Sequence, residues 1–168
     1  WDANAAEKAG YEHFMLKEIY EQPKTINDTI SPRIKDNDIV IEELNMSDEE
    51  IKEITKIHIV ACGSAYHTGV TAKYVIEGLA RIPVEVDVAS EFRYRDPILQ
   101  KGNMVIVISQ SGETADTLAA LRESRERGFK VLGIVNVVGS SIAREADNVF
   151  YTLAGPEIAV ATTKAYST

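Results

Sequence analysis

The sequence holds a single cysteine, Cys62, among 168 residues. A disulfide framework therefore cannot hold the fold together, and a lone thiol is typical of a reducing compartment, so the cytoplasm is the expected location. The chain also lacks a secretory leader and any long apolar run, which argues against a membrane protein. With 45% hydrophobic residues, its length is that of a globular protein able to bury a core.

Basic residues are scarce as well, with 18 Lys and Arg against 26 Asp and Glu. Residues 1–55 hold 14 acidic and 6 basic side chains and residues 56–168 hold 12 of each, so the net charge of −8 lies entirely in the first part. A nucleic-acid-binding protein needs a basic face that releases counterions from phosphates. The sequence thus predicts no nucleic-acid partner. It predicts an acidic helical leader over residues 1–55 that packs on a domain over residues 56–168.

The leader shows helical patterns. Apolar residues at helical spacing predict a helix over residues 5–20, with Pro23 as the stop, and a second short helix over residues 25–30, ended before Pro32. Ser47 followed by Glu50 forms a capping-box pattern and predicts a further helix start. None of these residues suggests chemistry, so the leader is interpreted as structural packing or a partner contact.

From residue 57 onward, strand and helix patterns alternate. Apolar runs predict five strands, over residues 57–61, 84–88, 104–108, 131–135 and 149–153. Helical spacing predicts helices over residues 66–81, 114–128 and 142–146, with a short helical turn at residues 90–92. Strands joined by helices form right-handed parallel units. The predicted fold is an α/β three-layer sandwich with a five-stranded parallel sheet in the flavodoxin-like order 2-1-3-4-5.

Two loops rich in small and hydroxyl-bearing residues follow the first and third predicted strands. They read CGSA at residues 62–65 and SQSGET at residues 109–114. In the order 2-1-3-4-5 the winding direction reverses between these two strands, and ligands of such sheets bind at that reversal. Hydroxyls and free backbone N–H groups at a helix N-terminus suit a phosphate. The alternative is an ordinary turn whose Ser and Thr residues only cap the following helix.

The sequence lacks the motifs of several other kinds of functional site. There is neither a GxxxxGK[ST] nor a GxGxxG fingerprint, which leaves a small phosphorylated molecule as the ligand rather than a nucleotide. The spacing of His13, His58 and His67 is not that of a metal site, so neither a metal nor another cofactor is predicted. Cys62 follows a buried strand without a cationic setting and is interpreted as a wall residue rather than a nucleophile.

Six segments carry a resemblance to a known family. They read KEIYEQP at 17–23, ACGS at 61–64, ASEFRYR at 89–95, SQSGETADT at 109–117, GSS at 139–141 and EIAVATTKA at 157–165. Together they resemble the first sugar-isomerase (SIS) domain of the glutamine–fructose-6-phosphate aminotransferase family, the glucosamine-6-phosphate synthases, over nearly the whole chain. SQSGET is typical of any SIS module that binds sugar phosphates, whereas KEIYEQP and ASEFRYR together indicate this family.

The resemblance implies a sugar-phosphate ligand, fructose 6-phosphate or glucosamine 6-phosphate. It assigns the phosphate to Ser109, Gln110, Ser111 and Thr114. It assigns the sugar to Cys62, Gly63, Ser64, Val160 and Thr162. The family loop usually reads C-G-T-S, whereas this sequence reads CGSA at residues 62–65. Ala65 therefore stands where the family has a serine, and one hydroxyl that contacts the sugar is missing. Glu113 is expected to point away from the site, because its carboxylate would repel a phosphate.

Members of the family make glucosamine 6-phosphate and glutamate from fructose 6-phosphate and glutamine, in amino-sugar biosynthesis. The resemblance implies that a glutaminase domain, a second SIS domain and a C-terminal tail supply the catalytic groups, in a protein that forms homodimers. This chain is therefore expected to bind the sugar phosphate with no catalytic residue of its own. A regulatory SIS module that senses a phosphosugar without turnover and a purely structural flavodoxin-like domain are the alternative interpretations.

Overall fold

The computed structural model describes residues 7–168 and divides the chain into two compact units. One unit combines the residues up to 42 with residues 151–168, and the other consists of residues 43–150. The second unit holds both predicted ligand loops. The predicted division between residues 55 and 56 stays a prediction.

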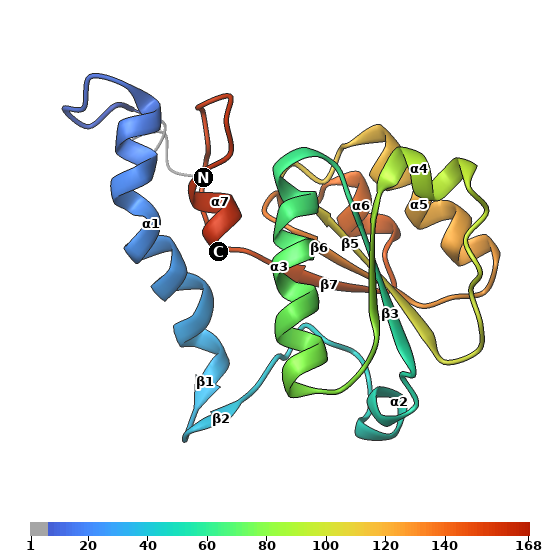
Figure 1. Cartoon of the computed structure of the whole chain (residues 1–168). Coiled ribbons are helices and arrows are strands. Elements are labelled where there is room, and N and C mark those ends of the chain that lie inside the picture. Colours follow the sequence, from blue (N-terminus) through green and yellow to red (C-terminus); the bar gives the residue numbers. More distant parts are fainter. Residues whose placement is uncertain (1–6) are drawn as a thin grey trace. The chain divides into compact units, whose positions relative to one another are not determined.

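The larger unit is built around a five-stranded sheet (Figure 1). Its strands are β3 (Lys56–Ala61), β4 (Val84–Val88), β5 (Asn103–Ser109), β6 (Val131–Val135) and β7 (Asn148–Tyr151), the last of which crosses the unit boundary by one residue. The spatial order is β4-β3-β5-β6-β7, and β3 pairs in parallel with both β4 and β5. This order is the predicted 2-1-3-4-5, and the predicted flavodoxin-like α/β sandwich is confirmed.

The first helix of this unit precedes the sheet, and the other four each follow one of its strands. They are α2 (Asp48–Lys52), α3 (Gly63–Leu79), α4 (Ala89–Tyr94), α5 (Ala115–Glu126) and α6 (Ser141–Glu145). The predicted capping box at the start of α2 is confirmed, since Glu50 N donates to Ser47 Oγ at 3.2 Å and Ser47 N donates to Glu50 Oε2 at 2.9 Å. The predicted start of α3 at residue 66 is wrong. The helix begins at Gly63, so most of the supposed loop after β3 is its first turn.

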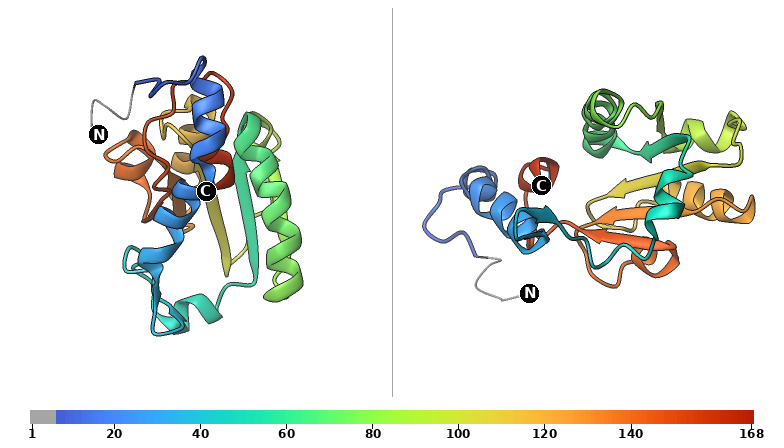
Figure 2. Two further views of the ribbon diagram at one scale, coloured as in Figure 1. Left: turned by 90° about the vertical axis from the view of Figure 1, so that its left-hand side faces the viewer. Right: turned by 90° about the horizontal axis from the view of Figure 1, so that it is seen from below.

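Successive side chains of β3 point to opposite faces of the sheet, and helices cover each face. Ile59 faces α3, because it approaches Gly69 of that helix. His58 faces the opposite side, where its ring meets Phe92 of α4 edge-on at a centroid distance of 6.4 Å. Helix α5 packs on both α4 and α6. In Figure 1 the strands accordingly pass between α3 on the left and α4 and α5 on the right, and Figure 2 shows the same strands from two further directions.

The smaller unit contains α1 (Phe14–Ile30), a 3₁₀ turn (Ser31–Arg33), the two-residue strands β1 (Ile34–Lys35) and β2 (Asp38–Ile39), and α7 (Lys164–Ser167). The strands form a hairpin around Asp36 and Asn37, whose φ angles of 53° and 64° are ones that Asp and Asn tolerate. No helix within residues 7–168 is long and apolar enough to cross a membrane.

The prediction of two short leader helices separated by Pro23 is wrong. A single helix, α1, runs through Pro23, and the first residues of the predicted 5–20 helix lie outside the described part of the chain. Proline lacks the N–H that would bond the carbonyl four residues earlier, here that of Ile19. In the structure the side-chain amide of Gln22 donates to that carbonyl at 3.0 Å. This substitute hydrogen bond lets the helix continue.

Two glycines of α3 provide a test of how closely this helix lies on the sheet. A Cβ on Gly69 would stand 2.8 Å from Ile59 Cγ2 and 3.1 Å from Val86 Cγ1, whereas a Cβ on Gly78 would meet nothing within 4 Å. Gly78→Ala is therefore expected to stabilise the chain by about 0.5–1 kcal/mol, the usual gain in helix propensity. Gly69→Ala is expected to be less stable than Gly78→Ala by about 1–3 kcal/mol, the cost of overpacking.

Urea unfolding of the two variants beside the wild-type chain measures this difference. Equal stabilisation by both substitutions would contradict the close contact of α3 with β3 and β4.

Candidate functional site

The candidate site lies where β3 and β5 end beside each other. The two strands run in parallel with Ala61 opposite Ile108, so the segments that follow them emerge at the same edge of the sheet. Because β4 lies beyond β3 and β6 lies beyond β5, this edge is the point where the winding direction reverses. The structure thus brings together the two segments that the sequence pointed to, residues 62–64 and 109–114.

The segment after β5 is folded tightly around the buried hydroxyl of Ser109. Gly112 N donates to Ser109 Oγ at 3.0 Å, and Ser109 Oγ lies 2.9 Å from Thr114 Oγ1 in a bond that either hydroxyl can donate. On its outer side, Ser111 Oγ accepts from Glu113 N at 3.2 Å, and Gln110 is half-buried. Four predicted phosphate ligands are thus held in one compact turn.

Helix capping does not explain where the hydroxyl of Thr114 points. Thr114 is the N-cap residue of α5, yet its side chain makes no capping hydrogen bond to that helix. The hydroxyl is directed to Ser109 instead. Backbone N–H groups in the first turn of α5 have no intrahelical acceptor and mark the positive end of the helix dipole. This geometry favours an anion site over the alternative of a simple cap.

A second loop, between β6 and α6, buttresses the turn after β5. Asn136 N donates to Gln110 O at 3.1 Å, and Ile142 N donates to Gly112 O at 3.0 Å. Gly112 has a φ of +67°, and a Cβ there would stand 2.0 Å from Ser140 Oγ, so only glycine fits. Ser140 Oγ is buried and has no hydrogen-bond partner among the described residues.

Glu113 points away from the turn, as expected. Its Oε1 accepts a hydrogen bond from Ser141 N at 2.7 Å, at the start of α6. The pKa of Glu113 is lowered, first by this backbone N–H and then by the Ser141 side chain, with a smaller contribution from Arg144. The carboxylate therefore anchors the loop between β6 and α6. Its negative charge is held away from the part of the turn that leads into α5.

The segment after β3 forms the other wall. Cys62 is the N-cap residue of α3 and is half-buried, and its Sγ accepts a hydrogen bond from Thr117 Oγ1 of α5 at 3.7 Å. This contact ties the two walls together. Gly63 and Ser64 are exposed in the first turn of α3, and Ala65 follows them there.

Val160 and Thr162, the other two predicted sugar contacts, belong to the smaller unit. Val160 is fully exposed and Thr162 is half-buried, in the segment that precedes α7. Two carboxylates shape this segment through backbone N–H groups. Glu18 Oε1 accepts from Ile158 N at 2.6 Å and from Ala159 N at 3.0 Å. Glu157 Oε1 accepts from Thr163 N at 2.8 Å.

The KEIYEQP segment therefore has a structural role. Glu18 is buried in α1 and holds residues 158 and 159, and Glu21 Oε2 accepts from the buried Lys164 Nζ at 2.7 Å. Two of the segments that carried the resemblance, 17–23 and 157–165, are thus one packed feature. Sequence reasoning missed it because the partners are far apart in the chain and because the buried residues of α1 are polar, which an apolar helical pattern does not reveal.

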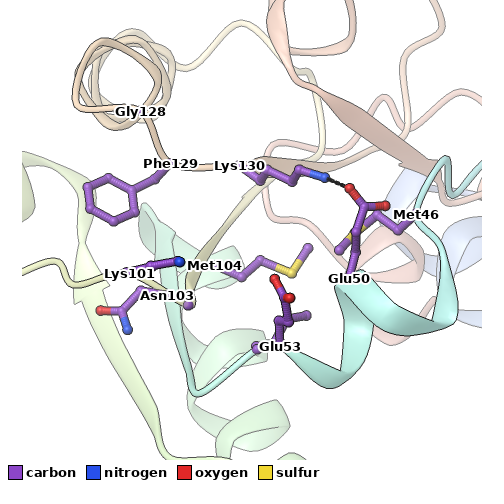
Figure 3. Close-up of a pocket in the computed structure, with 11 residues that line it drawn as sticks. Met46, Glu50, Glu53, Lys101, Asn103, Met104, Gly128, Phe129 and Lys130 are labelled. Atoms are coloured by element: carbon purple, nitrogen blue, oxygen red, sulfur yellow. Dashed lines mark hydrogen bonds and ion pairs between the residues drawn. The ribbon is translucent and has the colours of Figure 1, made fainter.

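A pocket of about 230 Å³ lies at the other edge of the sheet. Figure 3 shows that α2 and the starts of β5 and β6 line it, with an ion pair between Lys130 and Glu50. Since ligands of doubly wound sheets bind at the carboxyl ends of the strands, this pocket is not part of the candidate site.

One group of side chains within residues 7–168 has the composition and spacing of a metal site. It consists of His58, Glu85 and Asp87, in the middle of β3 and β4 rather than in the ligand loops. The spacing of the histidines in the sequence gave no sign of it, because the three residues come from two strands.

The fold and the turn after β5 define a class of flavodoxin-like domains with a hydroxyl-rich turn at the winding reversal. The chain belongs to the SIS domain family, which matches residues 50–168.

Two relatives with similar sequences share the same name. The glutamine--fructose-6-phosphate aminotransferase [isomerizing] of Clostridium acetobutylicum is 66% identical over 169 residues, covering 100% of this chain and 28% of that protein. The protein of the same name from Mycolicibacterium smegmatis is 59% identical over 99% of this chain and 26% of its own length. The chain thus spans little more than a quarter of these relatives.

Among solved structures, the C-terminal domain of glucosamine-fructose-6-phosphate aminotransferase from Francisella tularensis superimposes with a TM-score of 0.91. It is 47% identical, over 96% of this chain and 46% of that one.

The anchor made by Glu113 can be tested through pH. Because its pKa in the folded chain is lowered from the usual 4.5, its bond to Ser141 N contributes stability above about pH 4.5 and loses it as the pH falls through the lowered value. Glu113→Gln keeps an acceptor without the charge, so it is expected to unfold at a lower temperature than the wild-type chain at pH 7. Below pH 4.5 that difference should shrink. Thermal unfolding from pH 7 to pH 3 measures it.

Glu113→Ala removes the acceptor altogether and is expected to be the least stable of the three at every pH. A difference between wild type and Glu113→Gln that is the same at pH 3 and pH 7 would contradict the anchor.

Proposed function

We propose that this chain is the sugar-phosphate-binding SIS domain of an enzyme that converts fructose 6-phosphate and glutamine to glucosamine 6-phosphate and glutamate. The observation that carries the proposal is the turn of residues 109–114, which presents hydroxyls and backbone N–H groups at the winding reversal while its one carboxylate is turned away. The names of the relatives support the reaction, and the reaction belongs to the whole protein of which this chain spans about 28%.

In this proposal the phosphate lies against the turn after β5. Ser109, Gln110, Ser111 and Thr114 hold its oxygens, together with the first backbone N–H groups of α5. No lysine or arginine occurs within residues 109–114. The phosphate is therefore bound by neutral donors and a helix dipole, which gives it a fixed orientation but only moderate affinity.

The sugar extends from the phosphate toward the segment after β3. Cys62, Gly63 and Ser64 line it there, and the family resemblance alone assigns Val160 and Thr162 to its hydroxyls. Ala65 offers no hydroxyl, so Ser64 is the one hydroxyl of this segment available to the sugar. Loss of one such contact lowers affinity for the sugar more than for the phosphate.

The remaining parts of the enzyme are assigned to other regions of the whole protein. These are a glutaminase domain, which supplies ammonia, a second SIS domain, and the contacts of a homodimer. The single cysteine supports a cytoplasmic location for the protein. We propose no cofactor for this reaction and no nucleic-acid or membrane partner.

The ligand preference follows from the phosphate turn. Fructose 6-phosphate and glucosamine 6-phosphate are expected to raise the melting temperature of the chain, and fructose and glucosamine are not. A ligand at 100 times its dissociation constant adds about 2.7 kcal/mol to the free energy of unfolding. A thermal-shift panel that also contains inorganic phosphate measures the preference. Equal shifts with the phosphorylated and unphosphorylated sugars would rule out the proposed phosphate site.

The variant Ser111→Ala separates binding from folding within the same panel. It is expected to abolish the phosphate-dependent shift while lowering the free energy of unfolding by only about 1 kcal/mol, the size of one hydrogen bond. Thr71→Ala is the matched control, since Thr71 is exposed on α3 and its hydroxyl donates to His67 O within the helix. The control should keep the full ligand shift.

The chain alone is expected to bind fructose 6-phosphate without isomerising it. Moving the carbonyl from C2 to C1 needs a base within about 3 Å of the C1 proton, a contribution of about 10²- to 10⁴-fold in rate. Glu113 is engaged with Ser141 N, and Lys164 is buried against Glu21. Incubation in deuterated water, followed by NMR at C1, measures exchange. If deuterium is incorporated at C1 and His67→Ala abolishes that incorporation, this chain contains a catalytic base and the prediction is wrong.

A further inference from the structure

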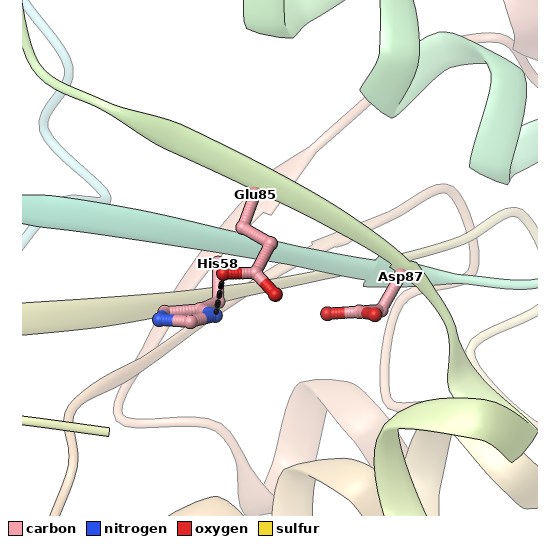
Figure 4. Close-up of side chains that lie close together, drawn as sticks. All are labelled: His58, Glu85 and Asp87. Atoms are coloured by element: carbon pink, nitrogen blue, oxygen red, sulfur yellow. Dashed lines mark ion pairs between the residues drawn. The ribbon is translucent and has the colours of Figure 1, made fainter. Parts of the chain in front are cut away.

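A histidine and two carboxylates meet on the face of the sheet that α4 covers (Figure 4). His58 of β3 stands opposite Glu85 of β4 in the parallel register, and Asp87 follows two residues later on the same face. One ligand atom from each of the three side chains lies within 4.8 Å of the other two. This group is separate from the turn after β5 and has no part in the proposed sugar-phosphate site.

The imidazole of His58 is buried, and within residues 7–168 no hydrogen bond of normal geometry satisfies either ring nitrogen, although the Asn103 side chain lies close enough to affect the ring's pKa. The His58 side chain is 1% exposed. Nδ1 points toward Glu85, with 4.0 Å between it and Glu85 Oε2. Buried polar groups are nearly always paired in folded proteins, so a buried ring aimed at two carboxylates indicates a missing partner.

The charge of the ring suits a metal ligand. Burial lowers the pKa of His58, as does the nearby Lys56, while Glu85, Asn103 and Asp87 raise it. The net shift is downward and favours the neutral imidazole, which carries a lone pair on one nitrogen. No proton has to leave before a cation binds.

Two cationic side chains cover the carboxylates from the solvent side. Lys56 Nζ lies 2.6 Å from Glu85 Oε2. Arg95 donates to Asp87 through Nε at 3.0 Å and Nη2 at 2.7 Å, and Nη2 also pairs with Glu85. Both cationic side chains are about one third exposed, so water can reach them. A divalent cation carries the same charge as the two side chains together, so exchanging them keeps the site neutral.

We propose that His58, Glu85 and Asp87 form a binding site for a divalent transition-metal ion, which Lys56 and Arg95 close when no ion is bound. An imidazole nitrogen with two carboxylate oxygens suits Zn²⁺, Co²⁺ or Mn²⁺ rather than the all-oxygen preference of Ca²⁺ or Mg²⁺. The ion would join β3 to the edge strand β4 across the face that α4 covers.

Titration of the chelator-treated chain with ZnCl₂ and CoCl₂ tests the site, by calorimetry and by the visible absorption of bound Co²⁺. One ion is expected to bind per chain. Asp87→Asn is expected to weaken binding by at least about tenfold, as is His58→Gln. Because His58→Gln alters a buried position and can destabilise the fold, Asp87→Asn carries the test if that variant does not fold. Arg95→Gln frees the carboxylates and is expected to tighten binding.

Glu145→Gln is the matched control, because Glu145 forms a similar carboxylate fork with Arg122, at 2.7 Å from both Nε and Nη2, without a histidine beside it. It should leave the affinity unchanged. The absence of Zn²⁺ and Co²⁺ binding would overturn the proposal. So would binding that survives Asp87→Asn but is lost in His13→Ala or His67→Ala, since it would then belong to an exposed histidine.

Discussion

The parallel pairing of β3 with β5 is the constraint on which the candidate site depends. Strand β4 follows β3 in the chain but lies at the edge of the sheet. Strand β5 lies on the other side of β3, nearer the centre of the sheet. Only this reversal leaves an opening between the helices that follow the two strands. The contact from Thr117 Oγ1 to Cys62 Sγ shows how close the two segments come. Sequence patterns more than 40 residues apart thus become one surface.

Carboxylates that accept backbone N–H groups shape the irregular parts of both units. Glu113 holds the start of α6, Glu18 and Glu157 hold the segment before α7, and Asp147 Oδ2 accepts from Val131 N at 2.8 Å. Each bond satisfies a backbone donor that regular structure leaves unpaired. A chain rich in acidic residues thus uses some of them to hold its backbone, from the buried Glu18 to the exposed Glu113 and Asp147.

The sequence predicted the sheet because its signals are local: unbroken apolar runs for buried strands and helical spacing between them. For the same reason it predicted that the two candidate segments, residues 62–65 and 109–114, follow buried strands. Errors arose where a distant or side-chain partner decides the outcome. Pro23 reads as a helix stop until Gln22 supplies the hydrogen bond, and the buried environment of His58 depends on the register of β3 against β4. The start of α3 at Gly63 was missed because small residues resemble a loop.

The hydroxyl pair of Ser109 and Thr114 has a consequence for how an anion is held. Either oxygen can donate the shared proton, so the pair can turn one O–H outward while keeping the other inward. A turn of this kind adapts to both the singly and the doubly ionised form of a phosphate without gaining or losing a proton of its own. The turn itself carries no cationic side chain, so release of an anion from it would separate no pair of opposite full charges.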